Sequence, residues 1–103
     1  MSAREYFETD LPQKFADKPD LASAVDAVFQ FDVEGAGVWT VDMTGEGTVV
    51  EGPAEDPGCV IGCSDAIWSE IVAEPMMATS HFMTGGLTAS DLGLAMKLQN
   101  LLA

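Results

Sequence analysis

Positive charge is scarce in this sequence. Four Lys and Arg residues stand against 17 Asp and Glu, which gives the chain a formal net charge of −13 at pH 7. Proteins that bind nucleic acids need clustered cations to hold the phosphates, and basic residues also draw proteins to anionic membrane surfaces. The composition therefore excludes a nucleic-acid partner and disfavours binding to an anionic membrane.

Long apolar runs, histidine and cysteine are also absent or rare. No run approaches the ~18 residues of a membrane span, and Met1–Glu8 is too charged for a secretory signal, so we expect no stable membrane insertion. Two cysteines without such a signal predict reduced thiols in a cytoplasmic protein. His81 is the one histidine, and nothing around the serines or cysteines resembles a catalytic motif or a metal site. We expect no enzyme, no catalytic residue, no metal and no cofactor.

What the chain does contain is apolar side chains. They make up 48% of 103 residues, too many for a disordered acidic segment, whose mark is high charge with low hydrophobicity. This length suits one domain with one core, or one core with a pocket inside it. We therefore predict a single domain over residues 1–103.

The first elements follow from apolar spacing. Phe7, Leu11 and Phe15 recur every four residues and predict a helix within Ala3–Asp17, which Pro12 should end or kink near Thr9 or Asp10. Apolar and polar residues alternate in Val28–Glu34 and in Val38–Met43, and a short strand follows at Thr48–Glu51, which predicts an antiparallel meander of three strands. A fourth strand is predicted at Cys59–Cys63, where Cys59, Ile61 and Cys63 share a face.

Helical spacing returns after the fourth strand. Ser64 is placed to cap a helix, and a further helix is predicted from Pro75 to Thr84, ended by the glycines at 85 and 86. A short strand at Leu87–Ala89 and a last helix to Leu102, capped by Ser90 or Asp91, complete the order. Segregated strands and helices indicate an α+β fold.

The sequence also resembles the sterol carrier protein type 2 lipid-binding domain from about Val28 to Leu102. The likeness lies in these segments, taken in order: Phe31-Asp32-Val33-Glu34-Gly35, Gly37-Val38-Trp39-Thr40-Val41-Asp42, Cys59-Val60-Ile61-Gly62-Cys63-Ser64-Asp65, Ile67-Trp68, Pro75-Met76-Met77, Phe82-Met83-Thr84-Gly85 and Gly93-Leu94-Ala95-Met96-Lys97-Leu98-Gln99. One departure is Gly85-Gly86-Leu87-Thr88, where the family has Gly-Lys-Leu-Lys.

This resemblance implies a five-stranded, mainly antiparallel sheet covered on one face by about four to five helices, with an apolar cavity between the two layers. It further implies non-catalytic binding or transfer of a hydrophobic lipid, such as a fatty acid, an acyl-coenzyme A or a sterol. Methionine suits such a site because it is flexible and polarizable. The predicted cavity residues are Phe29, Phe31, Trp39, Ile61, Trp68, Met76, Met77, Phe82, Met83, Met96 and Leu98.

A second reading of the same residues stays open. The chain could be a protein-interaction module that kept the fold and filled the cavity, and the loss of the family's two lysines fits that alternative. The partner would then be a protein acceptor or a second copy of the chain. An apolar stripe serves a core and a cavity equally well, so spacing alone does not separate the two readings.

Overall fold

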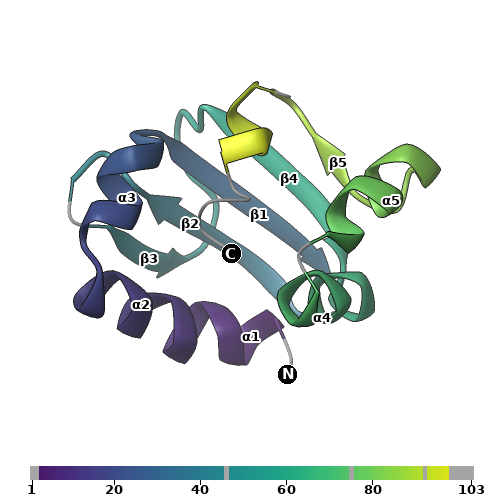
Figure 1. Ribbon diagram of the computed structural model, residues 1–103, viewed down its shortest axis with the longest axis horizontal. Coiled ribbons are helices and arrows are strands. Elements are labelled where there is room, and N and C mark those ends of the chain that lie inside the picture. The colour runs from purple at the N-terminus through teal and green to yellow at the C-terminus, as the bar shows by residue number, and fades with distance from the viewer. Residues whose placement is uncertain (1–2, 46, 75, 92, 98–103) are drawn as a thin grey trace.

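The computed structural model of the protein describes residues 3–45, 47–74, 76–91 and 93–97. Its elements, drawn in Figure 1, are α1 (Ala3–Glu5), the π-helical turn η1 (Tyr6–Asp10), α2 (Leu11–Asp17), α3 (Asp20–Val25), β1 (Val28–Glu34), β2 (Gly37–Asp42), β3 (Thr48–Glu51), β4 (Cys59–Ser64), α4 (Asp65–Ala73), α5 (Met77–Thr84) and β5 (Thr88–Ala89). Residues 93–97 are also helical. The predicted α+β class is confirmed.

The five strands form one mixed sheet in the order β3-β2-β1-β4-β5. Neighbouring strands are antiparallel except for β1 and β4, which run parallel with Phe31 opposite Ile61. The mainly antiparallel sheet is therefore confirmed. The strands β1 and β3 have the predicted bounds. In β1 a strict two-residue period admits only one register with a single buried face.

Burial divides the sheet into two faces. In β1 the side chains of Phe29, Phe31 and Val33 are buried, whereas the alternating Gln30 and Asp32 are partly exposed. We call these the inner and the outer face. Trp68 and Ile71 of α4 belong to the same buried cluster as the inner-face side chains, so the helices cover the inner face.

The chain crosses the outer face between β3 and β4, because those strands lie on opposite sides of β1. Residues 52–58 make this crossing. The Thr40 hydroxyl donates a hydrogen bond to the Gly52 carbonyl (2.8 Å), and the Ala54 N–H donates one to Gln30 Oε1 (3.1 Å). Helices thus cover one face of the sheet and a loop covers part of the other.

Pro12 does not end the first helix. Ala3–Asp17 is one helical run interrupted by η1, and Asp10 keeps helical dihedral angles (φ −70°, ψ −47°). A proline lacks the N–H of a normal helical bond and its ring crowds the carbonyl four residues earlier, here that of Glu8. The wider π turn just before Pro12 absorbs this conflict.

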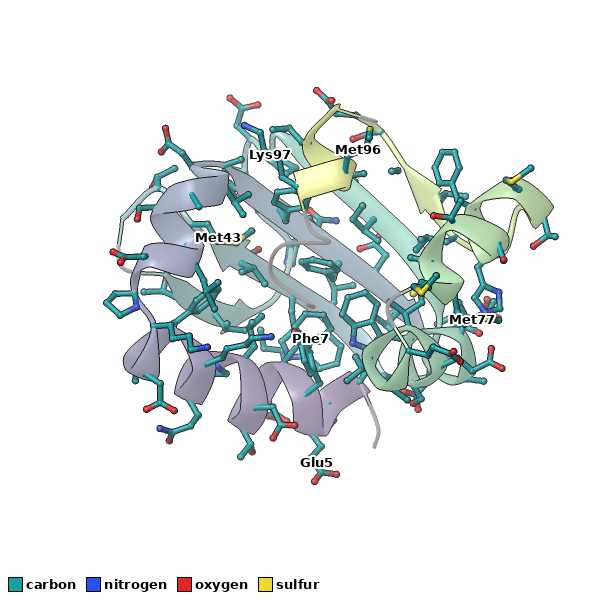
Figure 2. All side chains as sticks on the ribbon, viewed as in Figure 1. Glu5, Phe7, Met43, Met77, Met96 and Lys97 are labelled. Carbon is teal, nitrogen blue, oxygen red and sulfur yellow. The ribbon has the colours of Figure 1, made fainter. Side chains whose placement is uncertain are left out.

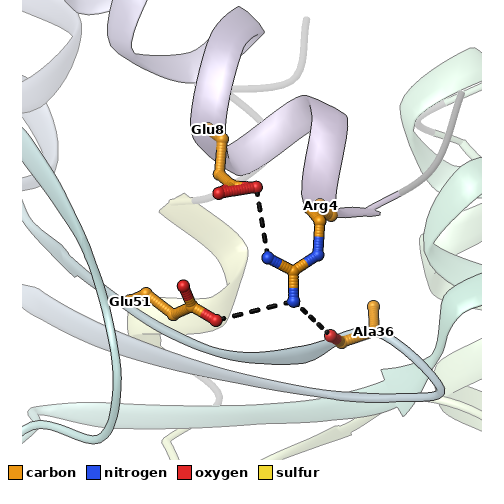
Figure 3. Close-up of polar contacts among 4 residues, drawn as sticks. All are labelled: Arg4, Glu8, Ala36 and Glu51. Carbon is orange, nitrogen blue, oxygen red and sulfur yellow. Dashed lines mark hydrogen bonds and ion pairs between the residues drawn. The ribbon is translucent and has the colours of Figure 1, made fainter.

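The N-terminal helix is tied to the sheet by Arg4 (Figure 3). Its guanidinium donates to Glu8 Oε2 (3.4 Å) and to the Ala36 carbonyl (3.2 Å), and it lies 3.5 Å from Glu51 Oε2. The same group lies over the Trp39 ring, 5.7 Å from its centroid. Arg4 therefore has a structural role.

The predicted helix signals in the C-terminal half operate as expected. The Ile67 N–H donates to Ser64 Oγ (3.2 Å), which caps α4, and Gly85 ends α5 in the left-handed region (φ 84°). The Leu94 N–H donates to Asp91 Oδ1 (3.1 Å), so Asp91 caps the helical residues 93–97. The predicted continuation of this helix to Leu102 lies outside the described residues.

Candidate functional site

The structure divides the predicted cavity residues into two groups. One group is fully buried on the inner face or on α4: Phe29, Phe31, Trp39, Ile61 and Trp68. In the other group the exposed fraction is 83% for Met76, 81% for Met83, 71% for Met96 and 37% for Phe82, while Met77 is half-buried. Leu98 lies outside the described residues. The first group forms a floor, and most of the second faces solvent.

Three side chains of the floor, Phe31, Trp39 and Trp68, form an aromatic cluster with Phe7 at its centre. The Phe7 ring stacks on Trp39 (centroids 5.0 Å apart) and on Trp68 (5.2 Å), and it meets Phe31 at 4.9 Å. Figure 2 shows Phe7 pointing into the molecule, whereas Glu5 on the same helical run points away. Sequence reasoning assigned Phe7 to a helical stripe but not to this site. The helical spacing of Phe7, Leu11 and Phe15 predicts that these side chains are buried, but it does not predict which residues they contact.

Three polar atoms in this cluster have no hydrogen-bond partner among the described residues: Tyr6 Oη, Trp39 Nε1 and Trp68 Nε1. A buried donor without a partner costs about 1–3 kcal/mol. Burial, followed by the charge of Asp10, raises the pKa of Tyr6 far above its ordinary 10.0, so its phenol remains a donor. These groups could donate to a water molecule or to an oxygen atom of a bound molecule.

The C-terminal helices cover the inner face more loosely than the N-terminal ones. The run from α1 to α2 buries Ala3, Tyr6, Phe7, Leu11 and Phe15, whereas α5 buries none of its residues. The C-terminal half instead supplies apolar side chains that touch the core while staying half-exposed: Ile67, Val72, Ala78, Leu87, Ala89, Leu94 and Ala95. This layer therefore leaves apolar surface that the core does not use.

Although α5 is loosely packed, its end is well formed. The His81 carbonyl accepts hydrogen bonds from the N–H groups of Gly86 (2.8 Å) and Leu87 (3.1 Å). His81 Nε2 lies 2.9 Å from Glu70 Oε2, an ion pair when the imidazole is protonated, which links α5 to α4. The helix is thus held at its C-terminal end by a few polar contacts rather than by buried side chains.

A separate hollow of about 730 Å³ opens at the carboxyl ends of β1 and β4. Asp32, Glu34, Ser64 and Thr88 contribute polar side chains to it, and Gly62 leaves room because a Cβ there would lie 2.7 Å from Thr88 Oγ1. Its lining includes none of the predicted cavity residues. Apolar side chains of Val33, Val38, Cys63 and Ile67 also line the hollow. Its carboxylates and hydroxyls nevertheless suit a hydrated surface better than an apolar ligand, so we do not assign the lipid site to this hollow.

Both cysteines are free and buried in the inner-face cluster, as the sequence predicts for core thiols. Burial, helped by the charge of Asp65, raises the pKa of Cys63 to about 11, so this thiol stays protonated at neutral pH. The Cys59 Sγ lies 3.5 Å from the Asp91 carbonyl. These thiols therefore act as small apolar side chains.

None of the described helices could traverse a bilayer, since none is both long and apolar enough.

Solved structures share this fold at low sequence identity. The sterol carrier protein domain 2 of Helicoverpa armigera is 23% identical, with a TM-score of 0.79 over 95% of this chain and 83% of that one. The palmitated SCP2L2 of Aedes aegypti is 21% identical, with a TM-score of 0.79 over 99% of this chain and 95% of that one. The apo sterol carrier protein 2 of Yarrowia lipolytica is 21% identical, with a TM-score of 0.72 over 96% and 82%.

A search of curated protein sequences finds no match for the chain. A family model does match, and it aligns with residues 7–103, which include every strand and the aromatic cluster around Phe7. The match thus spans nearly the whole sequence, and the structural neighbours share the same fold. The chain belongs to the SCP-2 sterol transfer family.

Proposed function

We propose that the protein binds a hydrophobic lipid, without changing it chemically, between the inner face of the sheet and the C-terminal helices. One observation carries this proposal: the segment from α4 to residue 97 presents apolar side chains that touch the core but are not buried by it. The floor would be Phe29, Phe31, Ile61 and Trp68. Met77 and Phe82 of α5 and Leu94 would form the cover.

The energetics favour an adaptable site over a rigid empty one. A dry cavity of roughly 300 Å³ would cost on the order of 7 kcal/mol, which is comparable to the whole stability of a domain of this size. A loosely held cover avoids this cost, since α5 can settle on the core when no lipid is present. Each methylene of an entering lipid then contributes roughly 0.8 kcal/mol on burial.

The charges of the chain limit the kind of lipid. A net charge of −13 repels ligands with several negative charges, such as an acyl-coenzyme A. Lys97, the cation on the helix at residues 93–97, is exposed (Figure 2). The unpartnered indole N–H of Trp68, a floor residue of the proposed site, favours a lipid with an oxygen atom to accept its hydrogen bond. We therefore propose a sterol or a fatty acid as the ligand.

A melting experiment tests this function. Native mass spectrometry of freshly purified protein should show the added mass of a lipid, and extraction with solvent should remove it. Returning a sterol or fatty acid at about 100 times its Kd should stabilise the stripped chain by about 2.7 kcal/mol, because only the folded state binds. For a domain of this size that corresponds to a rise in Tm of about 10–20 °C.

A pair of variants shows whether the shift comes from the proposed site. Ala95→Trp fills the space between the helix at 93–97 and the core, so this variant should fold and show no lipid shift. Ala24→Trp, at an exposed position of α3, should respond to lipid as the wild type does. Equal Tm values with and without every lipid tried would refute the proposal, and a bare chain that co-purifies with a stable protein partner would favour the interaction module instead.

A further inference from the structure

One stretch of this acidic chain has no Asp, Glu, Lys or Arg and only one histidine. From Pro75 to Ser90 there is no Asp, Glu, Lys or Arg, although the chain has 17 acidic and four basic residues. The described part of this stretch comprises α5, the turn after it and β5. Charge is therefore excluded from one continuous stretch of the chain, apart from His81.

The same stretch carries the most exposed apolar side chains. Met76 is 83% exposed, Met83 is 81% exposed and Phe82 is 37% exposed. The other large apolar side chains at the surface of the described residues are Val50 and Met96, on different elements. We call Met76, Phe82 and Met83 the neutral patch.

The histidine of this stretch does not add charge to the outward surface of α5. The His81 side chain is 18% exposed, and its Nε2 lies 2.9 Å from Glu70 Oε2 on α4. When the imidazole is protonated, this carboxylate pairs its charge. The nearest acidic residues along the chain, Glu74 and Asp91, flank the stretch on either side. The neutral patch thus consists of exposed apolar side chains in an uncharged stretch that acidic residues flank along the chain.

We propose that the neutral patch docks the protein reversibly on the surface of an uncharged, zwitterionic lipid bilayer, where the lipid is taken up or released. This inference rests on the proposed lipid-binding function. The inference adds to that function the surface by which the protein contacts the bilayer. Met76 and Met83 lie outside the proposed binding site and project from the helix that would cover it.

The charge distribution favours this occupant over the alternatives. A second copy of the chain would bring another net charge of −13 and be repelled, as would an anionic membrane. Three side chains also fall far short of the roughly 20–30 residues per side of a stable protein interface. Shallow insertion of a few apolar side chains into a neutral headgroup layer needs neither charge complementarity nor a large contact area.

Flotation with vesicles tests the proposal. The wild type should float with vesicles of pure phosphatidylcholine and float less with matched vesicles in which about a third of the lipid is phosphatidylglycerol. Met83→Asp should lower the bound fraction on phosphatidylcholine about tenfold, since burying one methionine side chain is worth at least this factor. As a control, Val50→Asp replaces another exposed apolar side chain, on β3 and outside the neutral patch, and should bind like the wild type.

A second variant guards against loss of helix α5. An Asp near the end of a helix is unfavourable for the helix dipole, whereas one just before its start is favourable. Met76→Asp precedes α5 and should therefore lower vesicle binding by a similar factor while keeping the helix.

Lipid content distinguishes failure of this inference from failure of the proposed function. Met83→Asp and Met76→Asp should both retain the lipid seen by native mass spectrometry while losing vesicle binding. If the wild type does not float with phosphatidylcholine, or if Met76→Asp and Val50→Asp float equally, the docking surface is refuted even where the lipid is still bound. A wild type that is dimeric in light scattering and becomes monomeric with Met76→Asp would instead make the patch a protein interface.

Discussion

Replacing Phe7 by alanine should lower the free energy of unfolding by about 4 kcal/mol, because a large buried aromatic side chain is lost and a cavity is left behind. Phe7 is 0% exposed and stacks between Trp39 and Trp68. Its loss leaves both indoles without their shared partner. Urea unfolding followed by tryptophan fluorescence measures the change directly, because Trp39 and Trp68, which both contact Phe7, are the only two tryptophans in the sequence.

A matched change at another phenylalanine gives the control. Phe82 is 37% exposed on α5, which buries none of its residues, so Phe82→Ala should cost less than about 1 kcal/mol. The same variant should weaken lipid binding, because Phe82 belongs to the proposed cover. If Phe7→Ala and Phe82→Ala lowered the stability equally, Phe7 would not be the centre of the core.

Gly47→Ala should cost about 3 kcal/mol, although it adds a single methyl group. Gly47 has a φ of +97°, in the region that favours glycine, and a Cβ there would lie 2.7 Å from Cγ of Phe15 and 2.9 Å from Cβ of Ala22. Backbone strain and a clash with two buried side chains therefore act together. A shift of the urea midpoint with an unchanged slope would measure this loss.

Gly45 provides the comparison within the same turn. A Cβ at Gly45 would meet nothing within 4 Å, and its φ lies outside the left-handed region. Gly45→Ala should therefore change the stability by less than about 0.5 kcal/mol. Equal costs at the two glycines would show that the turn does not press against α2 and α3 as described.

The sequence predicted the sheet well because its signals are local. The alternation in Val28–Glu34 specifies a strand with one buried face, and Ser64 marks the start of α4 through a hydrogen bond to a residue three positions away. The resemblance to the family supplied the five-stranded, mainly antiparallel sheet with helices on one face. The spacing of apolar residues along the chain does not predict that β1 and β4 pair in parallel.

The first helix shows where local rules are insufficient. Pro12 was predicted to end or kink it, yet a π turn at Tyr6–Asp10 carries the helix through. The competing factor is tertiary packing, since continuing the helix keeps Phe7, Leu11 and Phe15 together in the core. The periodic spacing identifies these side chains as buried, but it does not predict that Phe7 contacts both Trp39 and Trp68.

The candidate site could be predicted only in part. Bulky side chains in alternating strand positions fixed Phe29, Phe31 and Ile61 as the floor. On the short helix α5 the apolar residues Met77, Phe82 and Met83 are not confined to one face, so the sequence could not tell which of them turn outward. The hollow at the carboxyl ends of β1 and β4 had no signal either, because residues from distant segments of the chain form it.

The location of a bound lipid is the most direct test of the account. A photoreactive fatty acid should be bound by the stripped chain, crosslinked by light and mapped by peptide mass spectrometry. We predict crosslinks to α5, to residues 93–97 and to the inner-face side chains of the strands, with competition by unlabelled lipid. Crosslinks at Asp32, Ser64 or Thr88 in the hollow at the carboxyl ends of β1 and β4, or none that unlabelled lipid can displace, would contradict a lipid site between the sheet and the C-terminal helices.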